Sequence, residues 1–313
     1  MRALMKSFCI ALFTIFILVA CQSADDGGQQ NSNSGETITI NHELGETDVP
    51  LNPEKIIVFD FGMLDTLDYL DIPVVGIPKL NVPSYLDKYT GDNYENIGSL
   101  KEPDFEKIAN IDPDLIIISG RQSELYDELQ KLGPVVYLEL DYTRYMESFQ
   151  ENVKVIGEIF SEEETIEQVL ADIDEQIAEL HTQVEALDKN SLIIMANDDK
   201  ISAYGESSRF GVIHDVFGIP TVDTGIEAST HGMNVSFEYV VEQNPDLLYV
   251  IDRSAAMGEE AAAKNIVENE LMKSTKAMQN DDIYYLNPDV WYLSGGGIIS
   301  VQEMIQEIID SLQ

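Results

Sequence analysis

The chain has 313 residues and a formal net charge of −39 at pH 7, with 18 lysines and arginines against 57 aspartates and glutamates. This length is enough for two lobes that each bury a core. The large negative charge argues against nucleic acid as a partner, because a phosphate backbone is bound by clustered basic side chains.

The first 20 residues form a predicted signal peptide. Arg2 and Lys6 precede an apolar run over residues 8–20, which is too short to span a bilayer comfortably. The run ends in Leu-Val-Ala before Cys21, which resembles the lipobox of bacterial lipoproteins. We therefore expect Cys21 to be the lipidated first residue of a mature chain, anchored at the extracytoplasmic face of the cell membrane. A plain secretory signal with an incidental cysteine is the alternative.

The mature chain is predicted to divide into four segments. Residues 21–36 are rich in Asp, Gly, Gln, Asn and Ser and cannot bury enough apolar surface to fold, which predicts a disordered tether. An N-terminal lobe (37–142), connecting helices (143–188) and a C-terminal lobe (189–313) follow. Loss of Arg2 and Lys6 with the signal peptide would take the formal charge from −39 to −41.

Both lobes are predicted to be α/β, with mainly parallel sheets. Short runs that are apolar at every position are typical of strands covered on both faces. In the first lobe the predicted strands cover residues 56–59, 74–77, 115–118 and 135–138. In the second lobe they cover residues 192–195, 200–204, 219–222, 247–251 and 283–286, and a helix over 298–312 ends the chain.

A long amphipathic helix is predicted between the lobes. Ser161 and the three glutamates after it indicate a capping box, and apolar residues then recur at helical spacing as far as Leu187. The roughly 26 residues after Ser161 would span about 39 Å, enough to link two domains as a rigid rod. We expect a monomer with limited hinge motion; a coiled-coil dimer is the alternative.

An internal repeat relates the two lobes at a spacing of 132 residues. Phe105-Glu106 aligns with Phe237-Glu238, Pro113-Asp114-Leu115 with Pro245-Asp246-Leu247, and Arg121 with Arg253. Each copy predicts a short helix, a turn, a strand and then an arginine beyond the carboxyl end of that strand. Ligands of open α/β sheets bind at such ends, so we expect Arg121 and Arg253 to face one cleft from opposite lobes.

Arginine is scarce in the mature chain, which has four arginines and 12 lysines. Arg209 lies in a polar turn after the predicted strand that ends at Tyr204, so it also lies between a strand and the helix that follows it. A guanidinium is a fixed fork of donors that stays charged, and three of them predict a pocket for a compact, multiply anionic ligand. Surface arginines paired with carboxylates are the alternative, and Arg144 is assigned that structural role.

His231 and Tyr292 lie in loops expected on the same side of the second lobe. Imidazole and phenolate are both competent ligands for ferric iron. They are predicted to fill the coordination positions that an incomplete chelator leaves open. Packing roles for both residues are the alternative.

Five segments together resemble the iron-siderophore substrate-binding lipoproteins of ABC importers, and within them the branch that takes up ferric petrobactin and related catecholates. They are the segments over residues 119–129, 201–219, 230–234, 244–253 and 291–297. The resemblance implies the helical-backbone type of periplasmic binding protein, with two α/β lobes joined by one long helix. It also implies capture of an Fe(III)-siderophore, with no permanently bound cofactor, and delivery to an importer permease.

Residue roles follow from the same resemblance. Arg121, Arg209 and Arg253 would neutralise the anionic ferric catecholate, with Tyr204 counted among the ligand-binding residues. His231 and Tyr292 would complete the iron shell of tetradentate complexes. Two further residues, Glu106 and Glu238, would dock on the permease.

The sequence lacks the motifs of several other classes of protein. The sequence has no G-x-S-x-G elbow, P-loop, H-E-x-x-H or dinucleotide fingerprint, so no enzyme is predicted. Scattered histidines argue against a zinc or manganese receptor. Haem capture through His231 and Tyr292 stays open as the alternative function.

Overall fold

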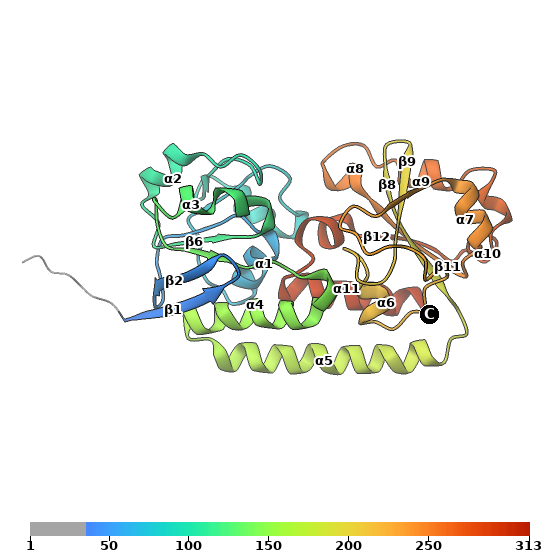
Figure 1. The fold of residues 1–313 in the computed structure, drawn as a ribbon, viewed down its shortest axis with the longest axis horizontal. Helices are drawn as coiled ribbons and strands as arrows, with labels where there is room; N and C mark the ends of the chain where they lie inside the picture. Colours follow the sequence, from blue (N-terminus) through green and yellow to red (C-terminus); the bar gives the residue numbers. More distant parts are fainter. Residues whose placement is uncertain (1–35) are drawn as a thin grey trace, which may run out of the picture. The chain divides into compact units, whose positions relative to one another are not determined.

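The computed structural model describes residues 36–313, which fall within one compact unit. The predicted signal peptide, Cys21 and nearly all of the tether lie outside the described residues. Between residues 36 and 313, two five-stranded sheets and a separate hairpin make up the β-structure (Figure 1). None of the helices between residues 36 and 313 is both long and apolar enough to span a bilayer.

The sheet of the N-terminal lobe is wholly parallel, in the order β5-β4-β3-β6-β7. Its strands are β3 (Ile56–Val58), β4 (Gly76–Ile77), β5 (Glu95–Asn96), β6 (Leu115–Ile118) and β7 (Val135–Tyr137). The helices of this lobe are α1 (Phe61–Tyr69), α2 (Phe105–Ile111) and α3 (Tyr126–Leu129). All four predicted strands are present, because their apolar side chains are buried on both faces of the sheet.

The sequence prediction missed an antiparallel hairpin at the start of this lobe. Its strands are β1 (Thr37–His42) and β2 (Gly45–Pro50). Only Ile40 and Val49 of the hairpin are buried apolar side chains, and they join the lobe's core. The hairpin could have been found from the alternation of Thr and Ile over residues 37–40, which is typical of a half-buried strand.

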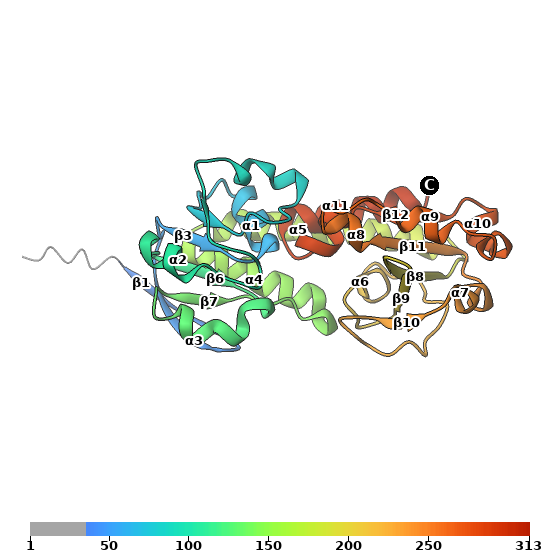
Figure 2. The same cartoon turned by 90° about the horizontal axis from the view of Figure 1, so that it is seen from above.

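The sheet of the C-terminal lobe is mixed, in the order β10-β9-β8-β11-β12. Its strands are β8 (Ser191–Asn197), β9 (Lys200–Tyr204), β10 (Met233–Val235), β11 (Leu247–Asp252) and β12 (Ile283–Leu286). β8, β11 and β12 are parallel, whereas β9 runs antiparallel to β8 and β10 runs antiparallel to β9. Figure 2 shows the strands side by side in the order of the sheet. The short helices of this lobe are α6 (Val212–Asp215), α7 (Phe237–Gln243), α8 (Arg253–Ala256), α9 (Ala263–Val267) and α10 (Lys276–Gln279).

The predicted strand over residues 219–222 is wrong. That segment makes one isolated bridge, between Thr221 and Ser191, and then turns away. Pro220 has no N–H to contribute to a ladder, and the Thr221 hydroxyl and backbone of Asp223 bond to each other to form a turn.

Two antiparallel helices, α4 (Tyr145–Phe160) and α5 (Glu163–Glu185), lie side by side and carry the chain from one lobe to the other (Figure 1). The apolar stripe of α5, from Ile166 to Val184, is buried in the same core as the C-terminal lobe. A second chain is therefore not needed to cover this stripe, and the coiled-coil alternative loses its basis.

The predicted capping box at Ser161 is wrong. Ser161 has a left-handed backbone, with φ of 59°, and ends α4 instead of starting α5. The N-cap of α5 is Glu162, and the helix has 23 residues. The reversal between two antiparallel helices requires a left-handed residue here, and this requirement decides the conformation of Ser161.

The last helix, α11 (Ile298–Ser311), is capped from the other lobe. The two carboxylate oxygens of Asp65 in α1 accept hydrogen bonds from the backbone nitrogens of Ile299 and Ser300, both at 2.7 Å. The Tyr85 hydroxyl also donates to Asp65, at 2.9 Å. Burial raises the pKa of the Asp65 carboxyl to about 7, although these hydrogen bonds act to lower it. One side chain thus ties the two lobes together at a helix N-terminus.

Glycine at position 297 permits this contact. A Cβ at Gly297 would overlap the Asp65 carboxyl and the carbonyl oxygen of Gly62 in α1. Gly297, the last of three consecutive glycines, therefore lets α11 approach α1 closely.

Asp65→Ala is expected to lower the free energy of unfolding by about 2 to 4 kcal/mol, because two helix N–H groups and one hydroxyl lose a buried acceptor. The folded-state pKa of Asp65 is above that of an unfolded aspartate, so ionisation of Asp65 makes the folded chain less stable as the pH rises from about 4 through 7. The loss should therefore be larger at pH 5 than at pH 8. Denaturant unfolding at both pH values measures it, with the exposed Asp92→Ala as the control. Equal unfolding free energies for Asp65→Ala and the parent would contradict the prediction.

Candidate ligand-binding site

The internal repeat corresponds to equivalent structure in the two lobes. α2 and α7 are each followed by one left-handed residue, Asp112 and Asn244 respectively, and then by β6 and β11. In each copy the aspartate of the Pro-Asp pair accepts a hydrogen bond from a backbone nitrogen before the neighbouring strand: Asp114 from Lys55 at 2.8 Å, and Asp246 from Asn190 at 3.1 Å. The repeat thus anchors the starts of β6 and β11 in the same way, and each arginine lies at the same spacing from the start of its strand, Arg121 from Leu115 and Arg253 from Leu247.

A large open cavity, called here the main cleft, has a volume of about 820 Å³ and is lined from both lobes. Four of the predicted site residues line it, namely Arg121, Arg209, His231 and Tyr292. A smaller cavity of about 270 Å³, called here the inner pocket, adjoins it in the C-terminal lobe. The inner pocket is lined by Arg253 and Tyr204, and it shares Arg209, His231 and Tyr292 with the main cleft.

Arg209 and Arg253 are both arranged around Tyr292. The Arg209 guanidinium lies 4.2 Å from the centre of the Tyr292 ring and donates a hydrogen bond to the Tyr292 backbone oxygen at 2.6 Å. The Nε atom of Arg253 donates to the Tyr292 hydroxyl at 3.1 Å, and its Nη1 atom donates to the Asn197 side-chain oxygen at 3.0 Å. Tyr292 itself lies in a short π-helical turn, η5 (Asp289–Ser294).

The two guanidinium groups change the acidity of this tyrosine. Burial alone would raise the pKa of the Tyr292 hydroxyl, but the charges of Arg209 and Arg253 and their hydrogen bonds outweigh it and hold that pKa below its usual value. A phenol with a lowered pKa ionises more readily, which favours it as a ligand for a hard cation such as ferric iron.

The arginines of the site differ from Arg144 in their partners. Arg144 makes salt bridges to Asp141, Glu147 and Glu151, as the structural assignment predicted. In the part of the chain that the structure describes, no carboxylate pairs with Arg121, Arg209 or Arg253. Since acidic side chains outnumber basic ones about threefold, three arginines without a carboxylate partner leave their charge available to a ligand.

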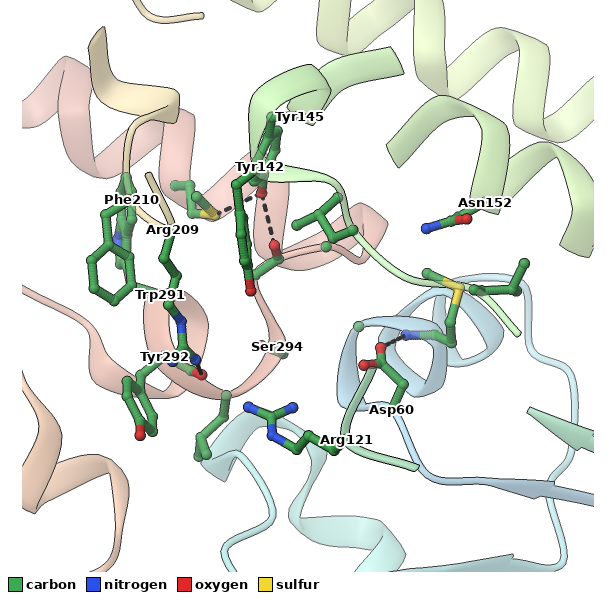
Figure 3. A pocket seen from close by; sticks show the side chains of 18 residues that line it. Asp60, Arg121, Tyr142, Tyr145, Asn152, Arg209, Phe210, Trp291, Tyr292 and Ser294 are labelled. Carbon is green, nitrogen blue, oxygen red and sulfur yellow. Dashed lines mark hydrogen bonds between the residues drawn. The ribbon is translucent and has the colours of Figure 1, made fainter. Parts of the chain in front are cut away.

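Arg121 belongs to a short 3-10 helix, η2 (Gly120–Leu125), directly after β6. Its side chain is exposed and makes no hydrogen bond to any residue between 36 and 313. Figure 3 shows Arg121 from the N-terminal lobe and Arg209 from the C-terminal lobe directed into the same space.

His231 and Tyr204 have contrasting environments. His231 is exposed in the loop before β10, and only its backbone nitrogen is bonded, to the Ser229 hydroxyl at 3.1 Å. Tyr204 is fully buried at the end of β9, with its ring 4.6 Å from that of Phe210 and its hydroxyl 3.8 Å from the Met195 sulfur. Tyr204 therefore forms the floor of the inner pocket, and His231 its rim.

The sequence prediction missed several residues of the main cleft. Tyr142 lies on the cleft wall and points toward Arg209 (Figure 3), and its hydroxyl has no hydrogen-bond partner among residues 36–313. Its position shortly after β7 could have indicated it, by the rule that ligands bind beyond the carboxyl ends of parallel strands. Four carboxylates also line the cleft; they are Glu43, Asp60, Glu139 and Asp141.

Glu106 and Glu238 occupy equivalent positions on the two lobes. Each lies in the first turn of its helix, α2 or α7, and each side chain is exposed. Neither lines the main cleft or the inner pocket. The two glutamates are thus separate from the arginine site and available to a partner.

The fold and the cleft define a two-lobed substrate-binding protein, and the chain belongs to the periplasmic binding protein family, whose model matches residues 59–290. It is 49% identical to the petrobactin-binding protein YclQ of Bacillus subtilis, over 99% of this chain and 100% of YclQ. It is also 32% identical to the ferric-anguibactin-binding protein FatB of Vibrio anguillarum, over 88% of each chain.

Solved structures agree with this assignment. The crystal structure of YclQ matches with a TM-score of 0.87 and 51% identity, covering 89% of this chain and 99% of that one. The catecholate-siderophore binding protein VctP of Vibrio cholerae matches with a TM-score of 0.83 and 33% identity, covering 88% of this chain and 100% of that one. These relatives are substrate-binding proteins, and this chain is likewise a binding protein and not an enzyme.

Proposed function

We propose that this protein binds a ferric siderophore of catecholate type between its lobes and delivers it to an ABC importer. The observation that carries the proposal is the set of three arginines, Arg121, Arg209 and Arg253, none of which is neutralised by a carboxylate within residues 36–313. A ferric catecholate is a compact anion rich in oxygen acceptors, which a guanidinium fork matches in charge and geometry.

The relatives support the ligand class. Those described above are named for petrobactin, ferric anguibactin and catecholate siderophores, and none of these names refers to haem. The haem alternative therefore gains no support from them. Two more distant Bacillus subtilis relatives, at 26% and 25% identity, carry the word lipoprotein in their names, which supports the expected anchor at Cys21.

The proposal is tested by titrating the protein with a panel of ferric catecholates, ferric hydroxamates and haem. Trp291 lines the same space as Arg121 and Arg209, so its fluorescence should be quenched when an iron complex binds. We expect saturable quenching by ferric catecholates, with a charge-transfer band in the visible spectrum. Tight binding of haem with a Soret band, and none of catecholates, would overturn the proposal.

We further propose that His231 and Tyr292 complete the coordination of iron. A tetradentate bis-catecholate leaves two of the six positions of ferric iron open. Both residues line the main cleft and the inner pocket, and the His231 ring has no hydrogen-bond partner among the described residues. The lowered pKa of Tyr292 favours the phenolate that would bind iron.

Tyr292→Phe and His231→Ala should each shift the charge-transfer band of a bound tetradentate ferric catecholate and leave that of a hexadentate one unchanged. The reason is that a hexadentate chelator leaves no position open for a protein ligand. Tyr292→Phe keeps the ring on which Arg209 stacks, so the change is confined to the hydroxyl. Visible absorption spectra of the complexes measure the effect. Equal spectral changes with both chelators would assign the two residues to pocket shape alone.

A further inference from the structure

The inner pocket extends beyond the predicted site residues, onto one face of the C-terminal sheet. The strand register pairs Asn197 with Lys200 and Met195 with Ser202 across β8 and β9, and Ser202 with Asn234 across β9 and β10. Paired residues point to the same face of a sheet, so these five side chains form one patch. The strands that carry them, β8, β9 and β10, are labelled in Figure 2. All five line the inner pocket.

The same face is apolar farther along the strands. There Ile193, Tyr204, Tyr249 and Ile251 are buried in the core that α5 and α11 share. Beyond Met195 and Tyr204 the residues on this face become polar, and a cavity of about 270 Å³ lies over them. This change from apolar to polar side chains marks the boundary between the part of the sheet that packs in the core and the part that lines the inner pocket.

The polar side chains of this patch are free to bind a ligand. Within residues 36–313, the side chains of Lys200, Ser202 and Asn234 have no hydrogen-bond or salt-bridge partner. The Asn197 side chain uses only its oxygen, which accepts from Arg253. Donors held on strands are placed more rigidly than donors on loops, which lowers the entropic cost of binding.

The charge of the inner pocket differs from that of the main cleft. Lys200, Arg209 and Arg253 line the inner pocket, and no aspartate or glutamate of the described chain does. The main cleft, in contrast, includes four carboxylates. In a chain with 57 acidic residues, a concave surface lined by three cations and no carboxylate favours an anionic oxygen group.

We propose that the inner pocket is a second subsite, which binds an anionic oxygen group on an arm of the ligand whose iron centre lies in the main cleft. Lys200, Ser202 and Asn234 recognise this group, together with Arg253. A carboxylate and a phenolate share the required chemistry. The inference rests on the proposed function and deepens it, because it assigns the site a preference for chelates that carry a further acidic arm.

The test uses three ferric chelates with the same tetradentate bis-catecholate core. One has a pendant carboxylate arm, the second a pendant phenolate arm and the third an uncharged amide arm. The parent protein should bind at least one acidic-armed chelate about tenfold more tightly than the amide-armed one, since one charged hydrogen bond accounts for about that factor. The double variant Lys200→Ala with Asn234→Ala should lose this preference and bind the amide-armed chelate like the parent.

Lys154→Ala, an exposed lysine of α4, is the matched control and should keep the preference. A preference for the carboxylate arm alone, or for the phenolate arm alone, supports the subsite and identifies its group. A preference that survives in the double variant, or none in the parent protein, overturns the subsite but leaves the proposed function standing. If the parent protein binds none of the three chelates, both the subsite and the proposed function are overturned. Thermal unfolding of each variant confirms that it is folded.

Discussion

Arg209→Ala is expected to weaken the binding of ferric catecholates by about 10- to 150-fold, because a charged hydrogen bond contributes roughly 1.5 to 3 kcal/mol. Arg121→Ala and Arg253→Ala should each fall in the same range. The net charge of the protein opposes the approach of an anion, but salt screens that repulsion beyond about 10 Å, so contacts inside the cleft decide the affinity. Fluorescence or calorimetric titration measures the three dissociation constants.

Among the three arginines, Arg209 should have the largest effect. It also stacks on Tyr292 and bonds to the Tyr292 backbone, so its removal loosens a second site residue. Arg209→Lys should recover only part of the affinity, because an ammonium cannot reproduce the planar fork. Arg144→Ala is the control, since its three salt bridges are exposed and should have little effect on affinity. Parent-like affinity in all three folded alanine variants would refute the assignment of the cleft.

Glu106→Lys combined with Glu238→Lys should abolish siderophore uptake by cells while leaving ligand affinity unchanged. The two glutamates begin equivalent helices, are exposed and lie outside both cavities. Exposed like charges at equivalent positions of two lobes suit a pair of basic pockets on an importer with two similar halves. Uptake of radioactive iron from its siderophore, together with titration of the purified variant, separates delivery from binding.

A matched control for the docking prediction is available on α5. Glu167→Lys combined with Glu179→Lys changes the net charge by the same amount at two exposed positions of that helix. This control should transport iron normally. If it loses uptake as well, total charge and not docking explains the effect; if the Glu106 and Glu238 variant loses affinity in parallel with uptake, the docking role is wrong.

Local sequence signals were sufficient for much of the fold. Strands that are buried on both faces, such as β6 and the Leu247 to Ile251 part of β11, are apolar at every position and are predicted within one or two residues. The amphipathic stripe of α5 and the 132-residue repeat likewise needed no tertiary information. Short edge strands such as β5 and β10 were missed because two or three residues with few buried side chains carry no periodic signal.

The candidate site could be found only in part. The sequence itself determined which residue types are scarce and where strands end, and from these Arg121, Arg209 and Arg253 could be selected. It could not determine that Arg209 stacks on the ring of Tyr292 while Arg253 donates a hydrogen bond to the Tyr292 hydroxyl. These residues come together only when the segments after β9 and β11 fold against η5.

Tertiary structure alone decided three further points. Asp65 caps helix α11, which begins at Ile298, 233 residues later in the chain. Ser161 ends one helix because the next must reverse direction, although its local sequence favours the start of a helix. Asn197, Lys200, Ser202 and Asn234 form one polar patch because strand pairing aligns them on one face. Periodicity and residue type are local properties of the chain and can be read in order, whereas a cap, a reversal or a pocket depends on contacts between segments that the sequence holds far apart.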